Sequence, residues 1–476
     1  MSINDISHTD LNDYDVFDID EELYRAFLED NEEWRTSYQV SFLLQQIILF
    51  LLEVNQCVIG CLSSVQYNIG KLFLVTLLQR FIAVSYLPTS VKYISSVFLG
   101  VLVLLDWISS KELMLAILAG TFCLVLVIAV TPSQLKGFMV TCACIASITL
   151  LQYFTSASEF VAVRGIVMVL AMKISSLAFD KRHDTARVAH LIPFFAYMAN
   201  PATVIFGPFH TFQEFETTLN RKTPKDSDLG THKVAFQEEL LSFLCGTVLI
   251  IIAICLLVYS SCMTIVVPEG SVFTDYFTAQ SFRTSHYFVS FLSQGLLALS
   301  GLRLAVSSPL SVEFPRSLVE VVIAWNIPMH RYLHAYIYVN VIPFGTAAAI
   351  FASFAISSLL HGFNFQISAV LLSLGFVCFF ENKLRNRISN RFSVCARARR
   401  CRKCEHKRGW KSWQAVFLNS LFFVHSVYQL IYLGAPFDGE GASEGYDFYH
   451  TMSTWRRHYF AAHWIGLAIA LLSSCI

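Results

Sequence analysis

The feature that most constrains this chain is the number of its long apolar stretches. A helix that crosses a bilayer needs about 20 mostly apolar residues. Several stretches are short or interrupted by polar residues, as in helices that pack against protein or line a cavity. We therefore predict an all-α, polytopic transmembrane bundle of about 11 spans. The candidate spans lie near residues 41–62, 71–88, 91–107, 113–131, 137–154, 161–178, 241–262, 286–305, 335–360, 364–380, 413–434 and 458–475.

The composition agrees with a membrane protein and excludes other classes. Hydrophobic residues make up 55% of the 476 residues and charged residues only 14%, whereas a soluble domain carries about 25% charge. The mean hydropathy is +0.55. A soluble enzyme, a disordered chain and a nucleic-acid-binding protein are therefore excluded. The chain also has no P-loop and no dinucleotide-binding glycine motif.

The charges are balanced in total but not along the chain. Residues 1–35 contain twelve acidic residues and two arginines, which predicts an acidic, disordered tail over 1–38, cytosolic or luminal, before a transmembrane domain over 39–476. Residues 383–411 contain twelve basic residues and a single acidic one. Short loops this rich in Lys and Arg lie on the cytosolic side, so this segment is predicted to be a basic cytosolic loop.

Two polar residues stand out within apolar surroundings. Asn326 precedes Pro328 in a segment, 311–333, that mixes charged residues with an apolar scaffold. Proline interrupts a helix, and a broken polar element at membrane depth normally lines a cavity. His361 follows a long apolar run and precedes Gly362. An ionisable residue between two apolar spans suggests a functional site, although a lone histidine is more often satisfied by a neighbouring helix.

The sequence around these residues resembles that of the membrane-bound O-acyltransferase (MBOAT) family. The blocks SSPLSVEFPRSLVEVVIAWNIPMHRYL (307–333) and SSLLHGFNFQISAVLLSLGF (357–376) carry the resemblance, together with VRGIVMVLAMKISSLAFD (163–180). They are most similar to the branch of the family that acylates Wnt proteins. The acidic tail has no counterpart that we recognise.

The resemblance implies a central cavity and a reaction. A palmitoleoyl group would move from palmitoleoyl-CoA to a serine of a Wnt protein at the endoplasmic reticulum membrane, with membrane lipid as surroundings, no further cofactor and no nucleic acid. His361 is then the expected general base, since its unperturbed pKa lies near neutrality. Asn326 is expected to orient the thioester or to donate a hydrogen bond to the developing oxyanion.

Four further residues are candidates for substrate binding. Trp325 is expected to wall the cavity beside the thioester, with a core aromatic as the equal alternative. Arg164 and Lys173 are expected to meet phosphates of CoA, with snorkelling at a helix end as the alternative. Arg331 is included because it follows Asn326 closely in the sequence.

A cysteine cluster lies inside the basic segment. Cys395, Cys401, Cys404 and His406 could supply the four ligands of a tetrahedral zinc site. Their spacing is irregular, so we expect no metal, and reduced or S-acylated thiols are the favoured interpretation.

Two other functions remain open from the sequence. A lysophospholipid or other lipid acyltransferase would use the same Asn326 and His361 on a different acceptor. A membrane transporter without acyl-transfer chemistry would use both residues as polar groups along a pathway.

Overall fold

The computed structural model describes residues 32–130, 135–180, 191–220, 229–266, 273–401, 403–439 and 447–476. The chain forms two compact units, Met1–Ile59 and Gly60–Ile476, and each is considered by itself. Most of the predicted acidic tail lies outside the described residues. Residues 32–38 do not belong to a disordered tail, because the helix α2 begins at Glu32.

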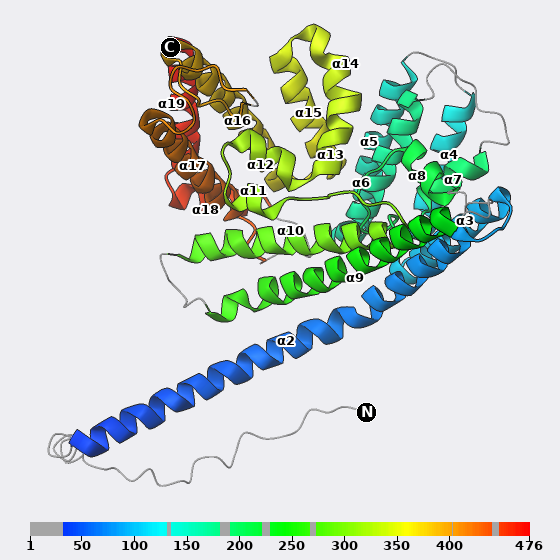
Figure 1. Ribbon diagram of the computed structural model, residues 1–476, viewed down its shortest axis with the longest axis horizontal. Coiled ribbons are helices and arrows are strands. Elements are labelled where there is room, and N and C mark those ends of the chain that lie inside the picture. The colour runs from blue at the N-terminus through cyan, green and yellow to red at the C-terminus, as the bar shows by residue number, and fades with distance from the viewer. Residues whose placement is uncertain are drawn as a thin grey trace. The chain divides into compact units, whose positions relative to one another are not determined.

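Most of the described residues are helical, which confirms the predicted all-α fold class (Figure 1). Within them, β-structure is limited to one isolated bridge between Val394 and Arg408. The helices of eight or more residues are α2 Glu32–Val84, α3 Thr89–Trp107, α4 Lys111–Val130, α5 Lys136–Phe154, α6 Ala157–Asp180, α7 Leu191–Met198, α8 Phe212–Leu219, α9 Leu229–Val266, α10 Thr274–Leu299, α12 Leu318–Trp325, α15 Thr346–Leu360, α16 Phe365–Phe392, α17 Trp413–Gly434, α18 Phe448–Arg457 and α19 Ala461–Cys475. The shorter ones are α11 Pro309–Glu313, α13 Ile327–Tyr332, a π-helix Leu333–Tyr338, α14 Val339–Val341 and a 3₁₀ turn Ile342–Phe344.

Eight helices in the described residues are long and apolar enough to cross a membrane, or nine if the bent pair α18 and α19 forms one span. The chain is thus a multi-pass membrane protein, but the count of about 11 is not confirmed. Two predicted spans, 41–62 and 71–88, are parts of the single helix α2. The predicted span 335–360 is broken before α15, where Pro343 has no N–H to donate and Gly345 adopts a φ of 107°.

Small residues allow α9 and α10 to lie side by side (Figure 1). A Cβ atom on Gly246 of α9 would lie 2.8 Å from the carbonyl oxygen of Gly295 on α10. Such close approach of backbones is typical of helix pairs in membranes. This contact fixes α10, which carries part of the candidate site.

The helix α16 packs against the start of α12 in the second unit. Its apolar residues Val377 and Cys378 pack against Leu318 at the start of α12. The basic segment 383–411 is therefore not a loop throughout, because α16 continues to Phe392 and its basic residues up to that point are helical. The irregular part begins at Ser393, which has a left-handed conformation.

Candidate active site

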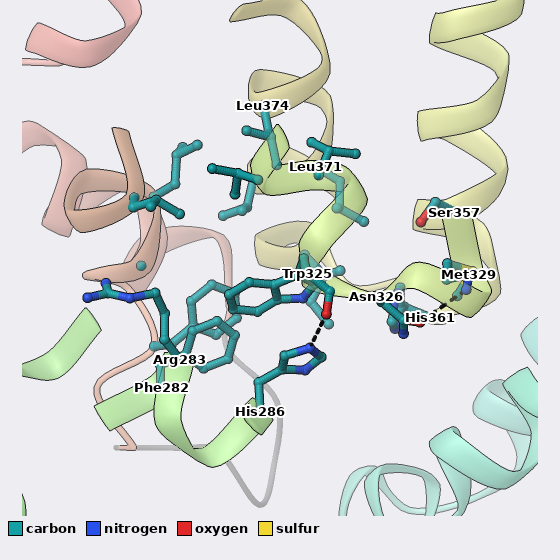
Figure 2. Close-up of a pocket in the computed structure, with 18 of the residues that line it drawn as sticks. Phe282, Arg283, His286, Trp325, Asn326, Met329, Ser357, His361, Leu371 and Leu374 are labelled. Atoms are coloured by element: carbon teal, nitrogen blue, oxygen red, sulfur yellow. Dashed lines mark hydrogen bonds between the residues drawn. The ribbon is translucent and has the colours of Figure 1, made fainter. Parts of the chain in front are cut away.

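A cavity of about 1490 Å³ lies between α6, α10, α12, α13, α15 and α16. It is larger than most single-ligand pockets, which measure about 300–1,000 Å³. His361, Asn326, Trp325 and Arg164 all line it, so four of the six predicted site residues share one space. Figure 2 shows the first three of them.

Asn326 lies between two short helices, and one of the two polar groups of its side chain has a hydrogen-bond partner. It ends α12 and caps the N-terminus of α13, where its Oδ1 accepts a hydrogen bond of 3.0 Å from the backbone N–H of Met329. Pro328 suits this position, because backbone N–H groups in the first turn of a helix have no acceptor within the helix, so the lack of an N–H in proline costs nothing there. The cap uses the side-chain oxygen of Asn326, Oδ1, and leaves the side-chain NH₂ group as a possible donor at the cavity wall.

His361 ends α15 and begins a tight turn. The following residue, Gly362, has a φ of 82°, and a Cβ atom there would lie 2.7 Å from the ring of Phe160 and 2.8 Å from Oε1 of Gln152. Gln152 also holds Phe363, accepting from its N–H at 2.6 Å and donating to its carbonyl at 3.1 Å. The turn is thus fixed from α5 and α6.

The His361 ring has no hydrogen-bond partner among the residues that the structure describes, although it lines the cavity. Both ring nitrogens are therefore available to a bound substrate. An imidazole without a protein partner can accept a proton from a hydroxyl that approaches it.

His286 of α10 is a site residue that the sequence reasoning missed. Its ring stacks on Trp325 with centroids 4.2 Å apart and planes 6° apart, and its Nε2 donates to the Trp325 carbonyl at 2.9 Å (Figure 2). A signal was present, because Arg283, His286 and Ser290 follow helical spacing along one face of a largely apolar segment. The stack fixes Trp325 directly beside Asn326.

Arg399 is a second missed residue of the cavity. It comes from the basic segment and lines the cavity, as do His330 and His334. A cation here and Arg164 on α6 give the cavity two groups that can bind phosphate. Much of the remaining lining is apolar and comes from α12, α15 and α16: Leu318, Val319, Val322, Ile323, Ile350, Phe354, Ile367, Val370, Leu371, Leu374 and Phe379.

Two predicted substrate-binding residues lie elsewhere. Lys173 is fully buried away from the cavity and donates to the Tyr197 carbonyl at 2.9 Å and to Thr203 Oγ1 at 2.8 Å. Arg331 also lies outside the cavity lining and pairs with Glu214 at 2.8 Å. Both cations have protein partners and neither lines the cavity, so the structure does not bring them together with Asn326 and His361, and their contact with substrate stays a prediction.

The cysteine cluster does come together in space, outside the cavity. The donor atoms of Cys395, Cys401, Cys404 and His406 all lie within 4.8 Å of one another. Burial, with the neighbouring thiols of Cys404 and Cys401, raises the pKa of the Cys395 thiol to about 11, so this thiol is protonated at neutral pH in the metal-free protein.

An imidazole with free nitrogens and an amide donor thus line one cavity that is large enough for a long acyl chain. A model of the membrane-bound O-acyltransferase family matches residues 93–433. The chain belongs to this family and is an O-acyltransferase, which confirms the resemblance found in the sequence and excludes the transporter alternative.

Within this family, the chain is similar to several proteins that share one name. A Caenorhabditis briggsae protein, named protein-serine O-palmitoleoyltransferase porcupine, is 32% identical over 384 residues, which cover 78% of this chain and 84% of that protein. The human protein of the same name is 32% identical, over 63% of this chain and 71% of its own length. The Anopheles gambiae protein of that name is 33% identical, over 64% and 67%.

Proposed function

We propose that this protein is a protein-serine O-palmitoleoyltransferase that transfers a palmitoleoyl group from palmitoleoyl-CoA to a serine of a Wnt protein at the endoplasmic reticulum membrane. The observation that carries the proposal is the pairing of Asn326 and His361 in one cavity, with the amide donor and the imidazole both free for substrate. The names of three similar proteins support the same reaction.

The chemistry follows from these two side chains. His361 takes the proton of the serine hydroxyl as its oxygen attacks the thioester carbon, because a neutral hydroxyl is a weak nucleophile. The NH₂ group of Asn326 donates to the oxyanion of the tetrahedral intermediate. When the carbon–sulfur bond breaks, the proton on His361 passes to the sulfur, and free CoA and an O-acyl serine leave.

The apolar wall between α12, α15 and α16 is the proposed place of the acyl chain. Each buried methylene contributes about 0.8 kcal/mol, so about a dozen methylenes resist exposure to water by roughly 10 kcal/mol. Leu371 and Leu374 line this wall near Trp325 (Figure 2). Trp325 would then wall the thioester end of the chain.

The CoA end is proposed to meet Arg399 and Arg164, two of the four arginines among the described residues that line the cavity. Arg399 belongs to the basic segment that the positive-inside rule assigns to the cytosol, where CoA is made. The Wnt serine would reach His361 from the luminal side. A reaction between two substrates from opposite sides requires a shared cavity within the membrane domain.

The test uses purified full-length protein in lipid nanodiscs with palmitoleoyl-CoA and a folded, serine-containing Wnt peptide. We expect the release of free CoA with acylation of the peptide serine, and a loss of roughly 10²–10⁴-fold in rate for His361→Ala. His425→Ala is the matched control, because His425 lies outside the cavity lining and its Nε2 has no partner among the described residues.

Two outcomes would reject the proposal. The first is full activity of His361→Ala expressed at the level of the unmodified protein. The second is acylation of a lysophospholipid in place of the peptide, which would assign the same cavity to a lipid acceptor.

A further inference from the structure

The segment that follows α16 gathers four side chains with metal-binding donors. Nδ1 of His406 lies 3.5 Å from Sγ of Cys404 and 3.9 Å from Sγ of Cys401, and Sγ of Cys395 completes a set within 4.8 Å. Zinc–sulfur bonds of about 2.3 Å at tetrahedral angles place sulfur and nitrogen ligands about 3.5 Å apart and two sulfurs about 3.8 Å apart. The two nitrogen–sulfur distances are therefore close to those of a Cys₃His zinc site, and no pair of the four donor atoms is more than 4.8 Å apart.

The tautomer of His406 agrees with a ligand role. The hydroxyl of Ser389, buried on α16, donates its one proton to the Val394 carbonyl at 2.7 Å. The same oxygen lies 2.8 Å from Nε2 of His406 and must accept from it. The proton of the neutral ring is then on Nε2, and the lone pair of Nδ1 is directed at the sulfurs. Such an outer hydrogen bond is typical of histidines that bind metals.

Hydrogen bonds from Arg316, Ser317 and Arg385 hold residues 395–398 of this segment, but these three side chains do not reach Cys401, Cys404 or His406. One backbone bridge pairs Val394 with Arg408, and Cys395 donates to the Arg408 carbonyl at 2.9 Å. The apolar cluster at its base consists of small side chains, Val394, Cys395, Ala396 and Ala415. A segment that cannot bury a core of its own is commonly held by a metal ion or disulfides.

The charge of the surroundings favours the same ligand. Three thiolates and one Zn²⁺ carry one net negative charge. The segment is strongly basic, so its cations would stabilise an anionic metal centre. The basic residues near the ligands in the sequence are Arg397, Arg399, Arg400, Arg402, Lys403, Lys407 and Arg408.

We propose that Cys395, Cys401, Cys404 and His406 bind one structural zinc ion, and that this ion holds the basic segment against the element that carries the catalytic asparagine.

The contacts beside the ligands show what the ion would hold. The guanidinium of Arg316 donates to the carbonyls of Cys395 and Arg397, each at 3.0 Å. Ser317, which caps α12, donates to the Ala398 carbonyl at 3.1 Å. The next residue, Arg399, lines the cavity. The proposed zinc site is therefore joined by a few bonds to both the start of α12 and a cation of the active site.

The first experiment measures metal content. Full-length protein is purified in detergent through a tag without histidine, and its metals are measured by inductively coupled plasma mass spectrometry. We expect one zinc per chain, and strong loss of zinc from Cys404→Ser and His406→Ala. Cys475→Ser is the matched control, because Cys475 is an exposed thiol in α19 outside the cluster, and it should keep one zinc per chain.

A second measurement keeps the proposal open to refutation even if a variant fails to fold. Alkylation of the unmodified protein, followed by mass spectrometry, should label Cys401 and Cys404 only after zinc is removed by a chelator. Monodisperse protein without zinc, a stoichiometric metal other than zinc, or cluster cysteines recovered as disulfides or acylated thiols would each overturn the proposal.

Discussion

Met329 fixes the orientation of the Asn326 side chain at the cavity wall. The Met329 N–H donates to Oδ1 of Asn326 at 3.0 Å, so the cap of α13 determines which half of the amide is free. Structural and chemical roles of one side chain are usually difficult to separate. Here they use different atoms, and a substitution can remove one and keep the other.

Asn326→Asp should fold normally and lose most of its activity. A carboxylate oxygen still accepts from the Met329 N–H, and Asp is as good a cap as Asn. It has no NH₂ group, so the oxyanion loses its donor, and we expect a fall in kcat of about 10²–10³-fold. The rate of CoA release and the thermal unfolding of the same sample would be compared.

Asn364→Asp is the control for this change. Asn364 lines the same cavity and caps α16 through the same geometry, accepting from Ile367 N–H at 3.0 Å, but the proposed mechanism assigns it no role. Near-normal kcat in Asn326→Asp would show that the amide donor is not used in catalysis.

Gly362→Ala should impair the enzyme through the position of His361. The positive φ of 82° is strained for alanine, and the added Cβ would press on the Phe160 ring at 2.7 Å. We expect both a lower unfolding temperature and a loss of acyl transfer. Gly120→Ala is the matched control, since a Cβ there meets no atom within 4 Å and alanine favours the helix by about 0.5–1 kcal/mol. Unchanged activity in Gly362→Ala would mean that the turn does not position the imidazole.

The sequence alone was sufficient to predict only part of the candidate site. The motif wording identified Asn326 and His361, and both line the cavity. It did not reveal the partner of Arg331, Glu214, which is 117 residues away in the chain, or the partners of Lys173, which lie on segments that no local pattern connects. A cation on a helix can be aligned with a site from sequence, but a distant ion pair cannot be read from spacing.

Two predicted helix boundaries were wrong for a related reason. Pro343 and Gly345 are recognisable breakers, yet the hydropathy of 335–360 hides them in one apolar run. In the basic segment, charge indicated a loop, whereas Glu381 and Arg385 stabilise a helix through contacts with residues far along the chain. Charge patterns predict exposure well only where no buried partner exists.

His286→Phe should weaken catalysis without disrupting the stack on Trp325. Phenylalanine keeps a flat ring at 4.2 Å from the indole but cannot donate to the Trp325 carbonyl. A hydrogen bond contributes about 0.5–1.5 kcal/mol, so we expect up to about a tenfold fall in kcat/KM from displacement of the Trp325–Asn326 backbone. Separate determination of kcat and KM for palmitoleoyl-CoA is the measurement. An unchanged kcat/KM would show that the stack alone positions Trp325.

Glu381→Gln should destabilise the protein more than any exposed ion-pair variant. Glu381 and Arg385 are fully buried and pair at 2.6 Å, and Glu381 also accepts from the Leu318 N–H at 3.1 Å while Arg385 donates to the Ala396 carbonyl at 3.0 Å. Removing one charge leaves the other buried and unpaired, which typically costs about 3–5 kcal/mol. Thermal unfolding in detergent should show a large fall in the midpoint.

Asp106→Asn provides the comparison for this buried pair. Asp106 pairs with Lys71, and both side chains are substantially exposed, so its loss should cost less than about 1 kcal/mol. The double variant Glu381→Leu with Arg385→Met should recover part of the stability, because it leaves no unpaired charge. A double variant that is less stable than Glu381→Gln would instead assign the stability to the hydrogen bonds with Leu318 and Ala396, through which α16 supports both α12 and the basic segment.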